Sequence, residues 1–362
     1  MNRIESLVAL NKVGEIGSVR LKRLIDFFGD PERVINAPKS KLALIQGIGE
    51  DIACRVASIK KEDIDRELNL VKDLGLKIIT IEDSAYPDNL KNIPGAPIVL
   101  YIKGELIPED KLAIGIVGSR RASFYGLNQA QDFAFGLANQ GFTIVSGMAR
   151  GVDTYSHKGA LKAGKRTIAV IGSGFNYLYP EENKKLADEI SQNGAVISEF
   201  PLDTKPLPYN FPRRNRLISG MSLGVLVVEA ARNSGALITA DFALEQGREV
   251  FAIPGKIDSA NSFGTNELIK QGAKLVANLN DILEEFNFTL TPVIKKSAED
   301  KGCLNNKEEE NLYGLISDQA IQLDDLAGIT GLDVPRISGI LFNLMVRKLI
   351  RELPGKHYVR YS

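Results

Sequence analysis

The sequence has no tryptophan, and only two cysteines and two histidines among its 362 residues. Cys54 and Cys303 lie far apart, and neither belongs to a Cys-x-x-Cys or Cys/His pattern, so a disulfide framework and a structural zinc site are excluded. Because His157 and His357 are the only histidines, a multi-histidine metal centre is excluded as well. We therefore expect no metal site.

The chain also lacks an excess of charge of either sign. Lys+Arg and Asp+Glu number 45 each, so there is no global field to attract DNA or an anionic membrane. Any contact with nucleic acid must come from local clusters of basic residues. No apolar run is long enough to span a bilayer, and the N-terminus shows no apolar signal segment. We therefore expect a cytoplasmic protein with no membrane contact.

Residues 1–75 show helical spacing of apolar residues, interrupted by two glycine turns at 13–17 and 46–49. A helical run follows each turn, at 18–28 and at 50–58. This pattern is typical of helix-hairpin-helix domains, in which backbone N–H groups at the turn and helix start can hold a phosphate. A small helical interaction domain with glycine turns is the alternative interpretation.

Residues 76–288 alternate apolar strands with helical segments. Such alternation indicates a mostly parallel sheet covered on both faces, which is a Rossmann-like, doubly wound α/β fold. In such sheets ligands bind beyond the carboxyl ends of the strands, so we expect functional residues in the loops that follow them. The predicted strands are 113–117, 143–145, 167–171, 195–198, 224–228, 250–253 and 274–276.

A linker and a third domain are predicted after the sheet. Residues 289–310 are polar and rich in acidic residues, which is typical of a linker. Residues 311–362 show three helical runs followed by two short strands, with Gly331 in the turn between the second and third helices. This order predicts a winged-helix domain.

The loops after the predicted strands carry arginines beside glycines. Gly118 lets backbone amides approach a phosphate, Ser119 adds a hydroxyl donor, and Arg120 adds a forked cation. Phe211 lies among basic residues in a long predicted loop over 201–216, and it offers a base-stacking surface of the kind that single-strand binders use. We expect these loops to converge into one cationic cleft for single-stranded DNA. The candidate DNA-binding residues are Gly118, Ser119, Arg120, Arg121, Arg150, Lys205, Phe211, Arg213, Arg214, Asn215 and Arg216.

Motifs for nucleotide cofactors and for hydrolases do not fit. The glycines at 115, 118 and 126 do not have the spacing of a dinucleotide-binding loop. Residues 159–166 nearly spell a Walker A loop, but Arg166 replaces the required Ser/Thr and the segment leads from a helix into a strand. Residues 220–224 match a G-x-S-x-G string but precede a strand instead of following one. We therefore expect no cofactor.

Two further polar residues have plain structural interpretations. His157 is expected to pack and hydrogen-bond on the helix that follows Asp153, a natural N-cap residue. Glu229 ends an apolar strand and is expected to cap the turn at 234–239. Ribose binding or acid catalysis by Glu229 is the alternative.

As a set, these loops resemble the DprA family, also called Smf, of bacterial DNA-processing proteins of natural transformation. The resemblance covers the central block, and the order of the predicted domains fits the whole chain. The motifs that carry it are 118–120, 146–153 with His157, 211–216, 228–230, 234–240 and 253–255.

The resemblance implies a helix-hairpin-helix or sterile-alpha-like N-terminal domain, an extended Rossmann-like core and a winged-helix C-terminus. It implies a non-enzymatic protein that binds single-stranded DNA in a basic pocket, forms a homodimer through the core, and loads the recombinase RecA in competence and DNA recombination. Many members carry a lysine shortly before the phenylalanine, where this chain has residues 208–210, and Lys205 is the candidate for that charge. The residues matched to the family's two binding motifs are Gly118, Ser119, Arg120, Phe211, Pro212, Arg214, Asn215 and Arg216.

An enzyme on a related core is the alternative. Phosphoribohydrolases that act on nucleoside monophosphates use an arginine and a glutamate, for which Arg150 or Arg216 with Glu229 are candidates. Their P-G-G-x-G-T loop is replaced here by Pro-Gly-Lys-Ile at 254–257. In a third interpretation the two terminal domains are protein-interaction modules, and the winged helix then binds protein instead of duplex DNA.

Overall fold

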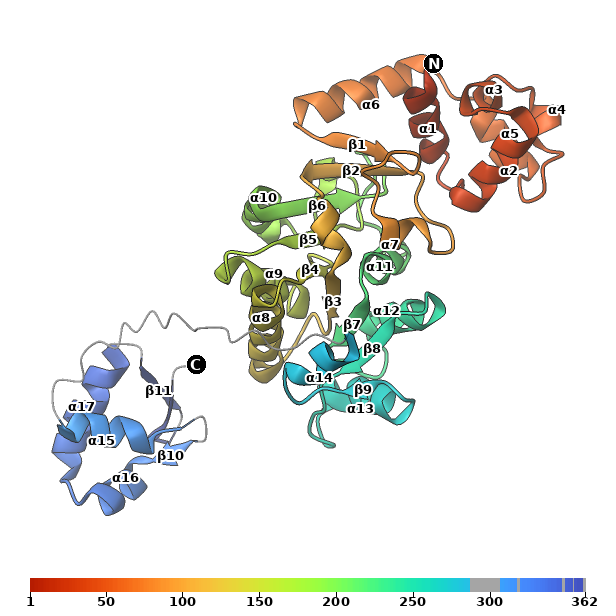
Figure 1. The fold of residues 1–362 in the computed structure, drawn as a ribbon. Coiled ribbons are helices and arrows are strands. Elements are labelled where there is room, and N and C mark those ends of the chain that lie inside the picture. The colour runs from red at the N-terminus through yellow and green to blue at the C-terminus, as the bar shows by residue number, and fades with distance from the viewer. Residues whose placement is uncertain (287–306, 318–319, 347–348, 354, 361–362) are drawn as a thin grey trace. The chain divides into compact units, whose positions relative to one another are not determined.

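The computed structural model describes residues 1–286, 307–317, 320–346, 349–353 and 355–360. The chain forms two compact units, residues 1–291 and residues 292–362 (Figure 1). Among the described residues, no helix combines the length and hydrophobicity that crossing a membrane requires.

The N-terminal part of the first unit is helical, as predicted. Gly14 and Gly47 adopt left-handed backbone, with φ of +88° and +87°, at the two predicted glycine turns. Gly17 and Gly49 are the N-cap residues of the helices that follow, so the turn–helix pattern is confirmed at both places. The helices are α1 (Arg3–Lys12), α2 (Ser18–Phe28), α3 (Pro31–Ile35), α4 (Lys39–Leu42), α5 (Glu50–Ala57) and α6 (Lys61–Asp73).

A nine-stranded sheet forms the centre of the first unit (Figure 1), with the order β1-β2-β6-β5-β4-β3-β7-β8-β9. The seven strands from β6 to β9 in this order run parallel, while β2 pairs antiparallel with both β1 and β6. The seven predicted strands are confirmed, and β1 and β2 were not predicted. The strands are β1 (Lys77–Thr80), β2 (Val99–Gly104), β3 (Ala113–Val117), β4 (Thr143–Ser146), β5 (Thr167–Val170), β6 (Gly194–Ser198), β7 (Gly224–Val227), β8 (Glu249–Ala252) and β9 (Lys274–Leu275).

Helices cover both faces of this sheet (Figure 1). The α-helices are α7 (Asp88–Lys91), α8 (Phe124–Asn139), α9 (Val152–Lys162), α10 (Lys184–Asn193), α11 (Asn210–Met221), α12 (Gly235–Glu245), α13 (Phe263–Lys270) and α14 (Asn280–Leu283). Short 3₁₀ helices lie at Pro108–Lys111, Phe175–Tyr177, Glu181–Asn183, Ala260–Ser262 and Glu284–Phe286. On one face, Leu137 of α8 belongs to a hydrophobic cluster with Ile116 of β3. On the other face, Leu217 of α11 belongs to a cluster with Val117. Burial of the strands on both faces explains their continuous apolar sequences.

The predicted long loop over 201–216 is wrong in its second half, because α11 begins at Asn210. Pro212 and the neighbouring polar residues favoured a loop in the sequence. However, Pro212 is the third residue of the helix, in the first turn, where backbone N–H groups have no intrahelical partner and proline is tolerated. Phe211 and the arginines that follow it therefore project from a rigid helix.

The N-terminal helices and the sheet share contacts within the first unit. Ser18 N donates to Ala96 O at 3.2 Å, and Arg213 Nη1 donates to Gly14 O at 2.9 Å. Side chains of α1, α2 and α5 share one hydrophobic cluster with Val99 and with other β2 residues. The first glycine turn is therefore a contact between the helices and the sheet region.

The second unit has the three helices and the two final strands of the predicted winged helix, and it adds a short strand, β10, that was not predicted. Gly331, with φ +68°, ends α16 before the turn to the next helix. The strands form one sheet in the order β10-β12-β11. The elements are α15 (Lys307–Leu315), β10 (Ile321–Gln322), α16 (Leu323–Thr330), α17 (Val334–Val346), β11 (Ile350–Leu353) and β12 (His357–Arg360).

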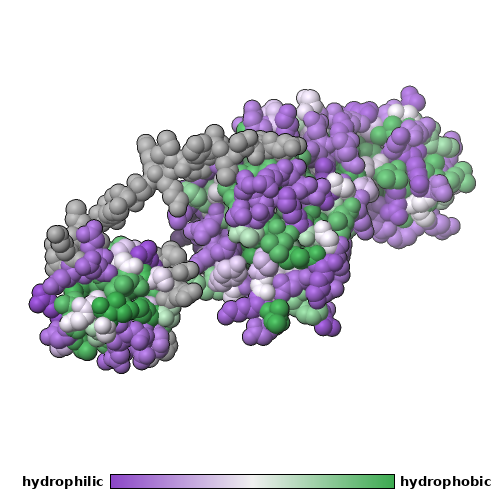
Figure 2. Space-filling model, turned by 60° about the horizontal axis from the view of Figure 1, so that its bottom comes forward, coloured by the Kyte–Doolittle hydropathy of each residue, from purple (hydrophilic) through white to green (hydrophobic). Residues whose placement is uncertain are grey.

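The start of this unit differs from the sequence prediction. Helix α15 begins at Lys307, so residues 307–310 of the predicted acidic linker are helical. The remainder of that linker, 289–306, lies outside the described residues. Figure 2 shows hydrophobic surface on this unit among hydrophilic surface. Its exposed large apolar side chains are Leu315, Ile329, Val334 and Phe342.

Candidate nucleic-acid interface

A large cavity opens where the strand order of the parallel sheet reverses direction. β3 lies between β4 and β7, so successive strands extend the sheet on one side of β3 first and on the other side afterwards. The loops that follow β3 and β7 therefore leave in opposite directions and create a crevice, the usual ligand position in such sheets. The cavity has a volume of about 1120 Å³. It is lined by the loops after β3 and β7 and by parts of α11 and α12. Residues 149, 153, 179, 206, 208, 260, 261 and 263 complete the lining.

The loop after β3 is held in place by the backbone of the loop after β7. Ser119 N donates to Glu229 O at 2.7 Å, and Ser119 Oγ accepts from Arg121 N at 3.1 Å. Gly118 is required, because a Cβ at this position would lie 2.6 Å from Cγ2 of Val152. This anchoring places the exposed side chains of Arg120 and Arg121 at the cavity.

Arg120 and Phe211 form a stacked pair in the cavity wall. The guanidinium carbon of Arg120 lies 5.0 Å from the centroid of the Phe211 ring, which is cation–π geometry. The ring also packs beside Tyr179, with 5.9 Å between centroids. A Cβ on Gly172, after β5, would lie 2.8 Å from the ring, so the glycine makes room for it. The predicted stacking residue and a predicted phosphate-binding residue are thus brought together.

Arg214 is buried, with 3% of its surface exposed, and lies in the floor of the cavity. Its Nη1 donates to the carbonyl oxygens of Gly147 and Val170, which follow β4 and end β5. Burial lowers the pKa of Arg214 to about 10, against the opposing attraction of the nearby Asp153 carboxylate. The same burial raises the pKa of Asp153. Arg214 therefore fixes α11 to the strand ends and also adds positive charge beneath the cavity.

The expectation of a single cleft lined by all the candidate arginines is wrong for three of them. Arg150 pairs with Glu182, and Arg213 and Arg216 both pair with Oε2 of Glu199, at 3.3 and 2.5 Å. None of the three lines the cavity, and neither does the exposed Lys205. The predicted residues that do line it are Gly118, Ser119, Arg120, Arg121, Phe211, Arg214 and Asn215.

The structure adds residues that sequence reasoning missed. Arg232 and Ser234, in the loop after β7, and Phe263, at the start of α13, line the same cavity. Ser234 caps α12 by accepting from Ala236 N at 3.3 Å. Arg232 lies four residues after the predicted strand 224–228. The expectation of functional residues in post-strand loops, which pointed to Arg120, therefore also applied to Arg232. Phe263 carried no such signal, because it follows β8 only after an irregular loop.

Glu229 is not the cap of the turn at 234–239 that the sequence suggested. Its carboxylate accepts from Ser123 N at 2.8 Å and from Ser123 Oγ at 2.5 Å. It packs against Gly126, where a Cβ would lie 2.5 Å from its carboxyl carbon. Glu229 therefore anchors the start of α8, where a negative charge is favoured by the helix dipole.

His157 has the packing role that the sequence predicted. It is fully buried, and its Nδ1 lies 2.7 Å from Oγ1 of Thr167, which itself donates to Ile144 O. The hydroxyl oxygen therefore accepts from Nδ1–H of a neutral imidazole. Asp153 is not the N-cap: Gly151 is, and Asp153 lies within α9 and accepts from Ala149 N at 3.1 Å.

Acidification should destabilise the fold through His157. Burial lowers its pKa from 6.5 to about 3, so the unfolded chain binds a proton between these pH values and the folded chain does not. Stability is therefore lost as the pH falls below 6.5. From pH 7 to pH 5 we expect a loss of about 2 kcal/mol of unfolding free energy from this group. Urea unfolding of the wild type and of His157→Gln at both pH values measures it, since the variant should lack this part of the pH dependence.

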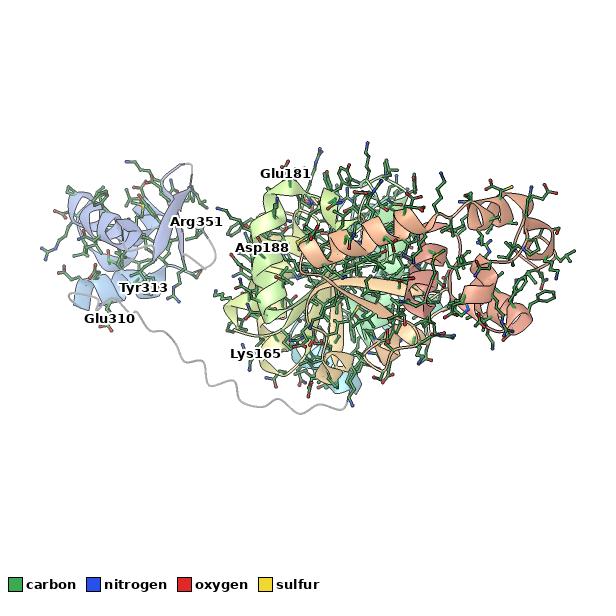
Figure 3. The ribbon with its side chains drawn as sticks, turned by 90° about the horizontal axis from the view of Figure 1, so that it is seen from above. Lys165, Glu181, Asp188, Glu310, Tyr313 and Arg351 are labelled. Atoms are coloured by element: carbon green, nitrogen blue, oxygen red, sulfur yellow. The ribbon has the colours of Figure 1, made fainter. Side chains whose placement is uncertain are left out.

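Charges elsewhere on the core surface include paired and acidic groups. Asp188 of α10 accepts from Lys103 Nζ of β2 at 2.6 Å. Glu181, in the 3₁₀ helix before α10, and Asp188, on α10, lie on the outer side of the first unit (Figure 3). Among the described residues, no group of three or more His, Cys, Asp and Glu side chains is arranged to hold a metal ion.

The fold and the site define a class: a Rossmann-like α/β protein with a winged-helix unit and an arginine- and aromatic-lined cavity at its switch point. The sequence model of the family "DNA recombination-mediator protein A" matches residues 77–287, and that of the "DprA winged helix domain" matches residues 297–356. The chain belongs to the DNA recombination-mediator protein A family, that is, to the DprA/Smf proteins.

Named relatives and solved structures agree with this membership. The chain is 40% identical over 315 residues to "Protein Smf" of Escherichia coli, covering 85% of this chain and 83% of that protein. It is 45% identical over 209 residues to "DNA processing protein DprA" of Streptococcus pneumoniae, covering 58% and 74%. The X-ray structure of the Streptococcus pneumoniae DprA matches with a TM-score of 0.70 and 34% identity, covering 80% of this chain and 99% of that one.

A second solved structure bears on the ligand. It belongs to DNA processing protein A from Helicobacter pylori, a protein described as having a unique single-stranded DNA binding mode. It matches with a TM-score of 0.52 and 31% identity, covering 58% of this chain and 95% of that one.

Proposed function

We propose that this chain binds single-stranded DNA in the cavity between the loops after β3 and β7. In this proposal it is a cytoplasmic, non-catalytic homodimer, paired through the Rossmann-like core, that loads RecA onto the strand during natural transformation and homologous recombination. The proposal keeps the predicted helical part (1–75), DNA-binding core (76–288) and winged helix (311–362), with the first two sharing one interior and the linker restricted to 289–306, because residues 307–310 are helical.

The Arg120–Phe211 pair is the observation that carries the DNA-binding proposal. A guanidinium stacked on an aromatic ring combines a cation for phosphate with a flat surface for a base. Bases in a duplex are already stacked on one another, so such a surface favours unpaired strands. The single-stranded DNA binding described for the Helicobacter pylori relative supports the same ligand class.

The geometry around Glu229 supports a binding protein over a phosphoribohydrolase. Both carboxylate oxygens of Glu229 are engaged by Ser123, so this glutamate is committed to holding α8. The segment at 254–257, which replaces the phosphoribohydrolase loop, is also bonded to the fold. Gly255 N donates to Asn266 Oδ1 at 3.1 Å, and Asn266 Nδ2 donates back to Gly255 O at 3.0 Å. The residues considered for catalysis thus have structural partners.

Replacing Arg120 by glutamine should weaken binding of oligo-dT about tenfold, because one phosphate contact and one cation–π partner are lost. The loss should be similar for other sequences, and the slope of log affinity against log salt should fall by about one. Fluorescence anisotropy of labelled oligonucleotides at two salt concentrations measures both quantities. Lys270→Gln, which removes an exposed charge of α13 away from the cavity lining, is the matched control. Equal affinity and equal slope in wild type and Arg120→Gln would contradict the proposed site.

A further inference from the structure

The cavity contains a second arginine–aromatic pair besides Arg120 and Phe211. The guanidinium carbon of Arg232 lies 4.1 Å from the centroid of the Phe263 ring. Phe263 is 40% exposed, so part of its ring is accessible to a ligand. Both residues line the same cavity as the first pair.

The Phe263 segment is firmly attached to both loops of the switch point. Gly264 N donates to Ala230 O at 2.6 Å, and Ala230 N donates to Asn261 O at 2.8 Å. The side-chain amide of Asn261 reaches the loop after β3 and donates to Arg121 O at 3.2 Å. Gly264 permits this approach, because a Cβ there would lie 2.8 Å from Ala230 O. The ring is therefore held at the cavity before any ligand arrives, which lowers the entropic cost of binding.

The two rings are held at strands too far apart in the sheet to contact the same base. Phe211 packs on Gly172, directly beyond β5, while the Phe263 segment is bonded to Ala230, beyond β7. In the sheet β4 and β3 separate these two strands, so the strand ends that hold the rings are about three strand spacings, or about 14 Å, apart, and Arg120 follows β3, which lies between them. Stacked bases rise only about 3.4 Å along a strand. The separation thus corresponds to several nucleotides.

Charged and polar groups line the cavity besides the two pairs. The first turn of α12 lines it at Gly235 and Ala236, where the helix dipole favours an anion, although the N–H of Ala236 already donates to Ser234 Oγ. Arg214 also lines it, and its buried Nε has no hydrogen-bond partner among the described residues. Its positive charge lies beneath the cavity and favours an anionic ligand there. The phosphates of a strand that joins the two rings would be attracted to this charge.

We propose that Arg232 and Phe263 form a second base-stacking site, so that the cavity holds one unpaired strand at two separated bases with phosphates over the first turn of α12. This inference rests on the proposed function and extends it, since it assigns residues and a path to the strand. Two stacking contacts on one strand raise affinity without sequence selectivity, because every base has a π-face.

The absence of tryptophan from the chain permits a direct test. Phe263→Trp and Phe211→Trp each create a single tryptophan at one pair, and Phe27→Trp on α2, an exposed position outside the cavity, is the control. On titration with an oligo-dT of about 20 nucleotides, stacking on a base should quench the emission of both cavity variants. The quenching should saturate together with the anisotropy change, and the control should keep its emission.

Affinity gives an independent measurement. Phe263→Leu and, separately, Arg232→Gln should each weaken binding about tenfold, and only Arg232→Gln should lower the salt slope. Thermal melts by circular dichroism verify that both variants are folded. If Phe263→Leu does not fold, Arg232→Gln still provides the test, because Arg232 is exposed.

The outcomes separate the two proposals. Quenching at Phe211→Trp, combined with an unquenched Phe263→Trp and with wild-type affinity in Arg232→Gln, would overturn the second site and leave the proposed function standing. An unaltered chain that fails to bind oligo-dT at all would overturn the proposed function, and the second site with it.

Discussion

Replacing Arg214 by methionine is expected to lower the free energy of unfolding of the first unit by about 3–5 kcal/mol, the usual cost of removing one partner of a buried charge pair. The variant loses the bonds from Nη1 to the carbonyl oxygens of Gly147 and Val170. It also leaves the buried Asp153 without the main cation that favours its charged form. Urea unfolding followed by far-UV circular dichroism measures the change.

Arg150→Gln is the matched control for this experiment. Arg150 is also paired with a carboxylate, Glu182, but its side chain is 58% exposed. Exposed ion pairs contribute only about 0–1 kcal/mol, so Arg150→Gln should unfold nearly as the wild type does. Similar unfolding free energies for Arg214→Met and Arg150→Gln would show that Arg214 does not hold α11 as its contacts indicate.

Replacing Glu199 by glutamine is expected to cost about 3 kcal/mol, because the side chain is only 2% exposed and neutralises two arginines. Arg216, with 14% of its side chain exposed, depends on this carboxylate more than Arg213, which is 41% exposed. The backbone oxygen of Glu199 also accepts from Asn11 of α1 at 3.0 Å. The substitution should therefore loosen α11 and its contact with the N-terminal helices.

The two arginines provide the comparison for Glu199. Arg213→Gln removes the more exposed partner and should cost under about 1 kcal/mol, while Arg216→Gln should cost more, since it leaves Glu199 buried with a single, longer ion pair. Chemical unfolding of the three variants under one condition gives the order. A cost for Arg213→Gln equal to that for Glu199→Gln would contradict the role of burial in this cluster.

The fold of the sheet was predictable because its strands are buried on both faces. The central parallel strands, such as β3 and β7, read as apolar runs between helical segments. β1 and β2 escaped prediction because they follow one another without an intervening long helix, so the alternation of strand and helix does not mark them. Their antiparallel pairing adds an edge that the doubly wound pattern does not require.

The missed helix α11 shows a limit of local sequence signals. Proline and consecutive polar residues favour a loop on average, yet Pro212 lies in the first turn of a helix, where it removes no hydrogen bond. The apolar residues that bury this helix, among them Leu217 and Ile218, come later in the segment. Helical periodicity extended backward from them would have indicated that Phe211 belongs to a helix.

The site was only partly predictable, because partners that are distant in the sequence decide whether an arginine is neutralised or faces the cavity. Sequence position after a strand correctly directed attention to Arg120, which lines the cavity. It also directed attention to Arg150 and Arg216, whose partners Glu182 and Glu199 lie 32 and 17 residues away. No local pattern shows which arginine a distant carboxylate will neutralise, and the pairing of Arg232 with Phe263 was hidden for the same reason.

The hydrophobic cluster that α1, α2 and α5 share with β2 bears on how this protein can be divided. It joins Leu24 and Ile52 to Val99 and Leu202, so a boundary at residue 75 runs through a common interior. A chimaera that exchanges only the first 75 residues between relatives would have to fit the larger part of that interior, which these residues supply, to a foreign partner. This packing therefore favours the helices and the sheet being inherited together as one block.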